Sequence, residues 1–176
     1  AFKDAIEVED YKLAFKLYLV LAEQGFVPAQ IRIGQFYENA IGVKKDSSSA
    51  FKWYLRSAER GSYSGQNNVG VCYKFGNGVK KNLTTAFEWF KKASEGSNRA
   101  LYNLALCFRD GEGIEQDYNE AIKIFKSLMD KNYASGICAL GVMYYEGKGV
   151  PIDYKEAVRI TKIAIKQNDN TSQRNL

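Results

Sequence analysis

Ala50-Phe-Lys-Trp-Tyr-Leu-Arg-Ser-Ala-Glu-Arg-Gly61 and Ala86-Phe-Glu-Trp-Phe-Lys-Lys-Ala-Ser-Glu-Gly96 are two copies of one pattern, and they decide the fold. Their first alanines belong to a series with steps of 36, 36, 35 and 36 residues: Ala14, Ala50, Ala86, Ala121 and Ala157. Three further series keep this register: the helix-starting polar residues Asp10, Asp46, Asn82, Asp117 and Asp153, the small residues Ala29, Gly65, Ala100 and Gly136, and the aromatic residues Tyr37, Tyr73, Phe108 and Tyr144. A fixed period of this length is the signature of a repeat protein.

A glycine turn separates the aromatic series from the polar series. It reads Gly76–Val79, Gly111–Ile114 and Gly147–Val150, with a degenerate first copy at Ala40–Val43. Glycine tolerates positive φ, so this turn suits a tight connection between two helices. The apolar spacing predicts a helix A over 28–39, 64–75, 99–110 and 135–146, and a helix B over 46–60, 82–95, 117–131 and 153–166. Residues 10–24 match a helix B alone.

The sequence therefore predicts an all-α fold: a right-handed α-α superhelical solenoid of about four helix-turn-helix repeats, opened by half a repeat. The repeat array is expected over 1–167, and a flexible tail over 168–176. Its members are a half repeat near 10–25 and four repeats near 26–61, 62–96, 97–132 and 133–167. The half repeat at the start indicates an excerpt of a longer array.

Residues that recur at one repeat position are expected to pack in the core. Trp53 and Trp89 share such a position, and aromatic residues there fill the space between helices. Cys72, Cys107 and Met143 share another, which favours packing over metal binding. The third cysteine is Cys138, and with no CxxC pair in the chain we expect three reduced, buried thiols.

Composition argues against catalysis. The 176 residues include no histidine, the side chain best suited to acid-base chemistry near neutral pH and the commonest metal ligand. A Ser-x-x-Lys motif at Ser49–Lys52 lacks the companion elements of the cell-wall-active serine enzymes. The glycine turns follow helices and lack the GxGxxG pattern of a dinucleotide site. We expect no enzyme, no metal and no cofactor, with a serine hydrolase as the weakest alternative.

The two stretches quoted first resemble the Sel-1-like repeat family, a relative of the tetratricopeptide repeats. Departures from its pattern are Ile124 and Ile160 in place of Trp, Asn132 in place of the closing Gly, and one residue missing between Trp89 and Gly96. Members of this family typically act as adaptors and scaffolds, including in endoplasmic-reticulum quality control, signalling and bacterial interactions with hosts. The resemblance implies a non-catalytic protein-protein interaction module that binds a partner peptide or domain on its concave face.

In related solenoids the A helices line that concave face, so the resemblance also implies candidate contact residues. Carried over by repeat position, they are Ile31, Gln35, Glu38, Asn67, Val71, Lys74, Arg99, Tyr102, Leu106, Arg109, Cys138, Val142 and Tyr145. The set mixes aromatic, amide and cationic side chains. An extended or acidic peptide is the expected partner, because Asn can bond a peptide backbone while Lys and Arg attract carboxylates. The competing interpretation is that Lys74, Arg99 and Arg109 are ordinary solvated surface.

Other partners and the compartment stay open. Helical repeats of this length can also read RNA, but basic residues are interspersed with acidic ones, so we expect no nucleic acid. The longest apolar run, Leu17–Ala22, is too short for membrane insertion. Reduced cysteines favour the cytoplasm; the secretory lumen, where Asn82-Leu-Thr84 would be a glycosylation sequon, and secretion as an effector are the alternatives. The oligomeric state is undetermined.

Overall fold

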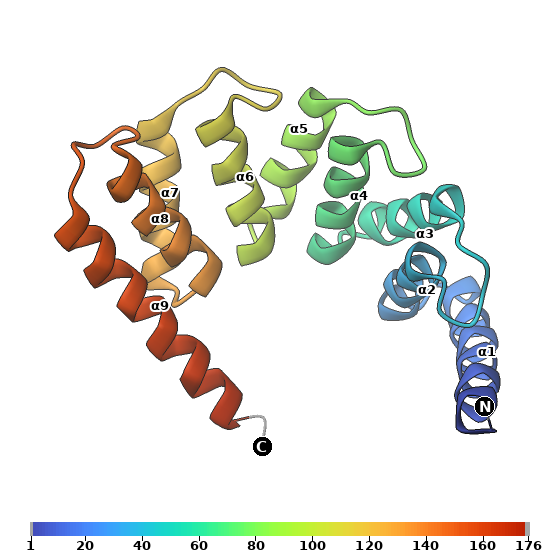
Figure 1. Ribbon diagram of the computed structural model, residues 1–176. Helices are drawn as coiled ribbons and strands as arrows, with labels where there is room; N and C mark the ends of the chain where they lie inside the picture. The colour runs from blue at the N-terminus through green and yellow to red at the C-terminus, as the bar shows by residue number, and fades with distance from the viewer. Residues whose placement is uncertain (1, 175–176) are drawn as a thin grey trace. The chain divides into compact units, whose positions relative to one another are not determined.

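A computed structural model describes residues 2–174 of the chain, and side chains from Asp10 to Lys166. These residues form nine α-helices and no strand (Figure 1). In chain order the helices are α1 Phe2–Glu23, α2 Val27–Asn39, α3 Ser47–Glu59, α4 Tyr63–Phe75, α5 Leu83–Ala93, α6 Asn98–Asp110, α7 Tyr118–Asp130, α8 Ala134–Glu146 and α9 Tyr154–Arg174. The all-α repeat fold expected from the period is confirmed. None of the helices in this range combines the length and apolar content needed to span a membrane.

The chain divides into two compact units: an N-terminal half, Ala1–Ser97, which contains α1 to α5, and a C-terminal half, Asn98–Leu176, which contains α6 to α9. Within each half, helices pack against their neighbours in the chain. The even-numbered helices are the A helices of the repeat, and α3, α5, α7 and α9 are the B helices.

The polar series begins the B helices as expected, with one exception. The Asp46 carboxylate accepts backbone N–H bonds from Ser48 and Ser49, both at 3.0 Å, and Asn82, Asp117 and Asp153 make the equivalent bond to the third residue of their own helix. Such caps satisfy N–H groups that have no partner inside the helix. Asp10 is the exception, because α1 begins at Phe2. The prediction that Asp10 starts a helix was wrong: no glycine turn precedes it, so the helix continues upstream.

The aromatic and polar series meet through a backbone bond that recurs in all four repeats. The amide of Asp46 donates to the carbonyl of Tyr37 at 3.0 Å. The same bond joins Asn82 to Tyr73, Asp117 to Phe108, and Asp153 to Tyr144. It closes the glycine turn between the two helices of each repeat, and explains why the two series keep a fixed separation.

The second glycine of the turn is required by a close approach. A Cβ on Gly78, whose φ is +72°, would collide with the backbone carbonyl of Ser47. Gly42 meets the backbone of Tyr11 in the same way. In the degenerate first turn Ala40 takes the left-handed conformation, with φ of 56°, that glycine adopts in the other copies.

Each half has its own apolar core. In the N-terminal half two buried clusters are formed by Ala22, Ala29, Ile33, Phe36 and Trp53, and by Ala50, Tyr54, Ala58, Val69 and Cys72. In the C-terminal half the largest fully buried side chains are Phe125, Leu128, Ile137, Leu140, Met143 and Ile160. The predicted core position of Trp53 is confirmed, whereas Trp89 is only partly buried at the edge of the second cluster.

Two helices are longer than the spacing predicts. α1 starts eight residues before Asp10, and α9 runs to Arg174 although its apolar pattern ends near residue 166. Neither extension contains a glycine or proline, so nothing in it stops a helix. The predicted flexible tail, 168–176, is thus helical up to Arg174, and its last two residues lie outside the described part of the chain.

Candidate functional site

The A helices of the C-terminal half line an open cavity of about 440 Å³ between α6 and α8. We call it the α6–α8 pocket. Its lining residues are Tyr102, Arg109, Ala134, Ser135, Cys138, Ala139 and Val142. Four of these, Tyr102, Arg109, Cys138 and Val142, are among the contact residues that the resemblance to related solenoids implied by repeat position. The structure brings them together around one cavity.

Small residues on the packed side of each A helix position this face. Gly136 of α8 lies where a Cβ would be 2.6 Å from the Cβ of Leu128, so α8 sits directly on α7. The Tyr102 ring of α6 packs with its centroid 6.1 Å from both Phe125 of α7 and Tyr133, which precedes α8. The wall of the pocket is therefore an aromatic residue held by neighbours on two sides.

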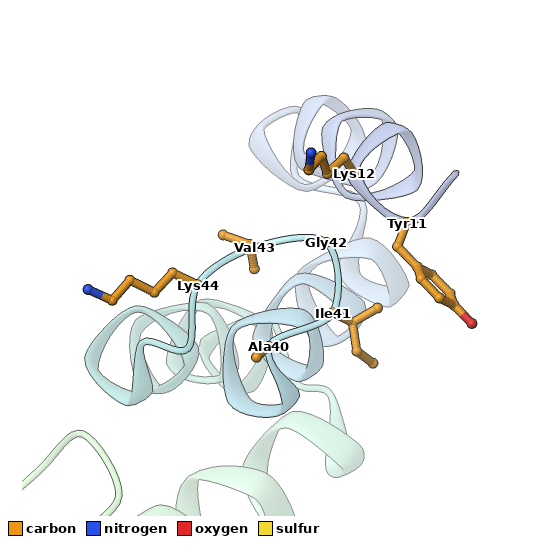
Figure 2. Close-up of a pocket in the computed structure, with 7 residues that line it drawn as sticks. All are labelled: Tyr11, Lys12, Ala40, Ile41, Gly42, Val43 and Lys44. Carbon is orange, nitrogen blue, oxygen red and sulfur yellow. The ribbon is translucent and has the colours of Figure 1, made fainter. Parts of the chain in front are cut away.

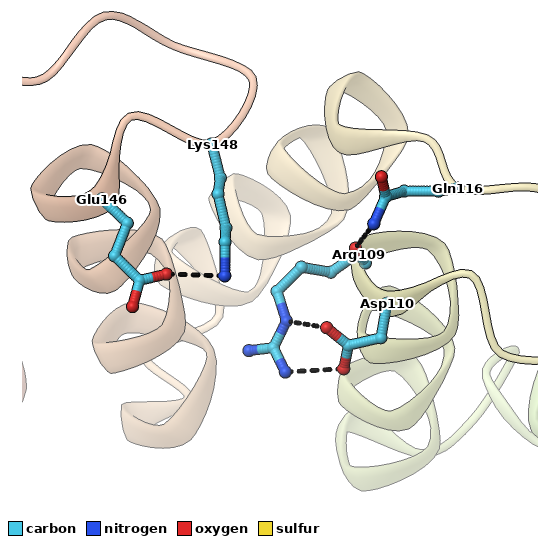
Figure 3. A network of polar contacts seen from close by, with 5 residues as sticks. All are labelled: Arg109, Asp110, Gln116, Glu146 and Lys148. Carbon is cyan, nitrogen blue, oxygen red and sulfur yellow. Dashed lines mark hydrogen bonds and ion pairs between the residues drawn. The ribbon is translucent and has the colours of Figure 1, made fainter.

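The polar edge of the pocket is an ion pair within α6. The Nε and Nη2 atoms of Arg109 donate to the two carboxylate oxygens of Asp110, both at 2.7 Å (Figure 3). The hydrogen bonds that Arg109 donates to the Asp110 carboxylate raise the pKa of Arg109 above its usual range. Gln116 also donates to the Arg109 carbonyl at 2.8 Å, which ties the end of α6 to the following turn. The Arg109 side chain is thus held in place, and its Nη1 takes no part in the ion pair.

A second ion pair lies at the end of α8 (Figure 3). Lys148 Nζ and the Glu146 carboxylate are 2.8 Å apart, and their hydrogen bond raises the pKa of Lys148. Each of the two cations near the pocket is therefore matched by its own carboxylate. The α6–α8 pocket combines apolar side chains with one charged lining residue, Arg109, which is paired with Asp110.

The remaining residues predicted on α6 and α8 lie outside this cavity or at its margin. Arg99 is exposed and Leu106 is partly buried. Tyr145 is 62% exposed, packs against Tyr154 with ring centroids 5.4 Å apart, and joins Val142 in a smaller cavity of about 180 Å³ against α9.

The predicted residues of the N-terminal half are engaged in other contacts. Asn67 is only 1% exposed, so it does not offer its amide on a surface, contrary to the expectation for it. The Glu38 carboxylate accepts a hydrogen bond from the Tyr54 hydroxyl at 2.7 Å. The other four residues have the following positions: Ile31 packs against the second core cluster, Gln35 accepts a bond from Arg32, Val71 is partly buried, and the Lys74 ammonium lies 5.7 Å from the Phe75 ring centroid.

The three cysteine thiols differ in their exposure to solvent. Cys72 and Cys107 are buried, as expected for packing residues. Burial, with a smaller contribution from Glu38, raises the pKa of Cys72 to about 12. The prediction that all three are buried was wrong for Cys138, which is exposed in the α6–α8 pocket. Its repeat position is shared by the partly buried Tyr102 and the buried Asn67, so the register alone could not show that this thiol is exposed.

Sequence reasoning also missed members of the site. Ser135 lines the pocket and occupies the repeat position of Arg99, so the register could have suggested it. Asp110 was not considered, although an aspartate directly after Arg109 is an obvious partner for it. Ala134 and Ala139 carry no chemical signal and line the cavity through their place on α8.

A larger cavity of about 580 Å³ lies in the N-terminal half between α1 and the degenerate turn. Figure 2 shows the residues that line it: Tyr11, Lys12, Ala40, Ile41, Gly42, Val43 and Lys44. Its side chains are mostly apolar, and Figure 2 shows Lys44 extending from the turn. It contains no acid-base pair.

The motif that suggested a serine enzyme has a structural explanation. Ser49 Oγ donates to the Asp46 carboxylate at 2.6 Å, so this hydroxyl completes the cap of α3. Among the described side chains, no three histidine, cysteine or acidic residues gather as metal ligands would.

Comparison with known proteins gives one consistent picture. A family model described as Sel1 repeat matches residues 4–26, 27–62, 64–98, 98–132 and 134–169. A solved Sel1 repeat protein from Oxalobacter formigenes is 31% identical with a TM-score of 0.79, over 89% of this chain and 65% of that one. The protein c5321, a protective antigen of uropathogenic Escherichia coli strains with an SLR fold, is 30% identical with a TM-score of 0.79, over 89% of this chain and 34% of that one. The chain thus spans less than two thirds of either relative. No curated protein matches it.

Proposed function

Because the chain belongs to the Sel1 repeat family, we propose that it is a non-catalytic scaffold that holds a partner polypeptide in the α6–α8 pocket. Proteins of this repeat type are generally interaction scaffolds, and their fold is typically non-enzymatic. The observation that carries the proposal is the cavity itself. Residues from two successive A helices line it, and two of them, Tyr102 and Cys138, occupy equivalent positions in their repeats.

The chemistry of the pocket favours an apolar anchor. Tyr102, Ala139 and Val142 offer carbon surface, and Val142 is 45% exposed, so covering it removes apolar area from water. A cavity of this size has room for at least one large side chain of a peptide. We expect an aromatic or long aliphatic residue of the partner to occupy it, as anchors do in other interfaces.

The rim adds one polar contact. Arg109 is fixed by Asp110, so its guanidinium is oriented before a partner arrives, and Nη1 can donate to a carbonyl oxygen of the peptide backbone. A strongly acidic partner is less favoured than the cations alone would suggest, because Asp110 and Glu146 already balance Arg109 and Lys148. The partner class is therefore an extended peptide with an apolar anchor.

Selection from a random-peptide display library on the immobilised chain tests this proposal. Peptides with aromatic or long aliphatic anchors should be enriched. Cys138→Trp fills the pocket at an exposed position, and it should weaken their binding by at least about tenfold. Lys162→Trp, an exposed residue of α9 outside the pocket, is the matched control and should bind normally. Equal binding by the wild type and Cys138→Trp would remove the pocket from the proposal.

A further inference from the structure

The glycine turns of the N-terminal half carry four exposed lysines. They are Lys44 and Lys45, between α2 and α3, and Lys80 and Lys81, between α4 and α5. We call these four residues the lysine edge. None of them forms an ion pair within the described part of the chain. Figure 2 shows the Lys44 side chain extending from its turn. Their charges are therefore not neutralised by carboxylates of this chain.

The two turns lie side by side. Gly78, the second glycine of the later turn, lies directly against the backbone of Ser47, which comes two residues after Lys45. Lys80 and Lys81 come two and three residues after Gly78. The four ammonium groups therefore gather at one edge of the N-terminal half. Grouped like charges raise the local potential, which attracts anionic partners.

The fold does not require these lysines. The corresponding residues of the C-terminal half are not cationic: Glu115, Gln116, Pro151 and Ile152. Their turns are nevertheless closed by the same backbone bond between the polar and the aromatic series. An adjoining repeat does not cover such a turn either, because the turn at 40–45 lies beside the turn at 76–81 and leaves Lys80 and Lys81 exposed. Neither turn geometry nor packing accounts for the lysine edge.

An exposed aromatic side chain lies beside the lysine edge. Phe75, the last residue of α4, is 63% exposed. Its counterparts in the other repeats are polar: Asn39, Asp110 and Glu146. The residue after it, Gly76, lies where a Cβ would be 3.4 Å from the Cβ of Lys81, so the base of that lysine is close to the end of α4. Covering the ring would remove apolar area from water next to the cations.

We infer that the lysine edge and Phe75 form a docking surface for an acidic segment of a partner polypeptide, whose carboxylates face the lysines while an apolar side chain covers Phe75. Charge complementarity selects the sign of the partner, because ammonium groups attract carboxylates. A nucleic acid is less favoured, since it is bound by basic residues that continue along a protein, and the next repeat carries Glu115 and Gln116 at the same positions. No residue of the α6–α8 pocket takes part, so the inference does not rest on that site.

A short fluorescent peptide in which one phenylalanine is flanked on both sides by glutamates is the probe. The peptide is titrated with the full chain at low ionic strength, and binding is read by anisotropy. We expect saturable binding that weakens as salt is added, because salt screens exposed charges. The same peptide with lysine in place of each glutamate should not bind.

Two double variants locate the contact. Lys45→Glu with Lys81→Glu reverses one charge in each turn and should weaken peptide binding by at least about tenfold. Lys91→Glu with Lys92→Glu is the matched control, because both lysines are exposed in the last turn of α5, at the opposite end of that helix from the lysine edge. It makes the same change in net charge and should keep the affinity within about twofold of the wild type. Circular dichroism checks that both variants keep the helical fold.

A double-mutant cycle tests the apolar contact. Phe75→Ser in the chain, and glycine for phenylalanine in the peptide, should each weaken binding by about threefold to tenfold. The two changes together should weaken it little more than either alone, because both remove the same contact. The exposure of Phe75 lets the fold persist in the serine variant.

Five results would overturn the inference. The first three are that the acidic peptide does not bind, that charge reversal at Lys45 and Lys81 leaves binding unchanged, or that the Lys91 and Lys92 variant loses as much affinity. The fourth is that the two ring removals act additively. The last is that a single-stranded RNA of equal charge binds more tightly than the peptide through the same lysines, since the surface would then be a nucleic-acid site.

Discussion

The A helices of the two halves share one register but present different faces. Asn67 of α4 occupies the repeat position of Tyr102 in α6 and Cys138 in α8. Asn67 is buried to 1% exposure, whereas Tyr102 and Cys138 line an open cavity. The backbone repeat therefore does not decide by itself whether a position is core or surface. The side chains around it do.

The two halves also differ in charge at the repeat position of Glu38 and Arg109. Glu38 of α2 accepts a hydrogen bond from the buried Tyr54, which ties it to the core of the N-terminal half. Its counterpart Arg109 in α6 is held by its neighbour Asp110 and stays at the pocket rim. One repeat position thus ties a side chain to the core in one half and places a polar group at the rim of the α6–α8 pocket in the other.

The largest expected difference between the halves is in thiol reactivity. Cys138 should react with iodoacetamide at pH 8 at least about a hundred times faster than Cys72, because the thiolate is the nucleophile and burial raises the pKa of Cys72 to about 12. Mass spectrometry of timed samples measures the rates. Cys107 lies in the C-terminal half at the repeat position of Cys72, and it should also react slowly. Fast labelling of Cys107 would show that the difference follows the half rather than the position.

Introducing tyrosine at Asn67 and at Cys138 should change the stability of the chain by different amounts. Asn67→Tyr replaces a buried amide side chain with a larger aromatic ring in a filled site. It should lower the free energy of unfolding by about 1–3 kcal/mol. Cys138→Tyr adds the same ring at an exposed position and should change it by less than about 0.5 kcal/mol. Urea unfolding followed by circular dichroism compares the two. An equal loss of unfolding free energy in the two variants would contradict the close packing around Asn67.

The smallest effect concerns the helix caps. Ser49 and then the backbone amides lower the pKa of Asp46 below its usual 3.8, so the folded state favours the charged carboxylate. The resulting stability is present above that pH and is lost as the pH falls through the lowered pKa. Asp46→Ala should lower Tm by a few degrees at pH 7, and the difference should shrink below pH 3.8. Asp117→Ala, which removes one cap bond, to the amide of Glu120, should lower Tm by less. A difference that grows in acid would contradict the cap role.

Most of the fold could be predicted because the residues that recur in each repeat have strong local conformational preferences. The polar series caps helices, the glycines turn them, and each A helix begins within one residue of its expected start. The errors lie at the two ends of the pattern, at Asp10 and beyond residue 166. There the period supplies no turn, and ordinary helix-forming residues extend the helix instead.

The candidate site was predictable only in part. The resemblance to related solenoids, applied by repeat position, implied that Tyr102, Arg109, Cys138 and Val142 share one face, and the structure places all four around one cavity. The same reasoning placed Asn67 on this face, although it is buried. A repeat period indicates which side of its helix a residue occupies, but not whether neighbouring helices cover that side. Pairing of Arg109 with Asp110, which balances the charge of the rim, depends on side-chain conformation that the repeat pattern does not encode.

The backbone bond from each cap amide to the aromatic carbonyl of the same repeat spans only nine residues, as between Tyr37 and Asp46. Contacts so near in sequence form with little loss of loop entropy, which places the chain among topologies of low contact order. Folding can then start in any hairpin and spread to its neighbours. An array of this kind can gain or lose a whole hairpin by gene duplication or deletion without disturbing the bonds inside the others.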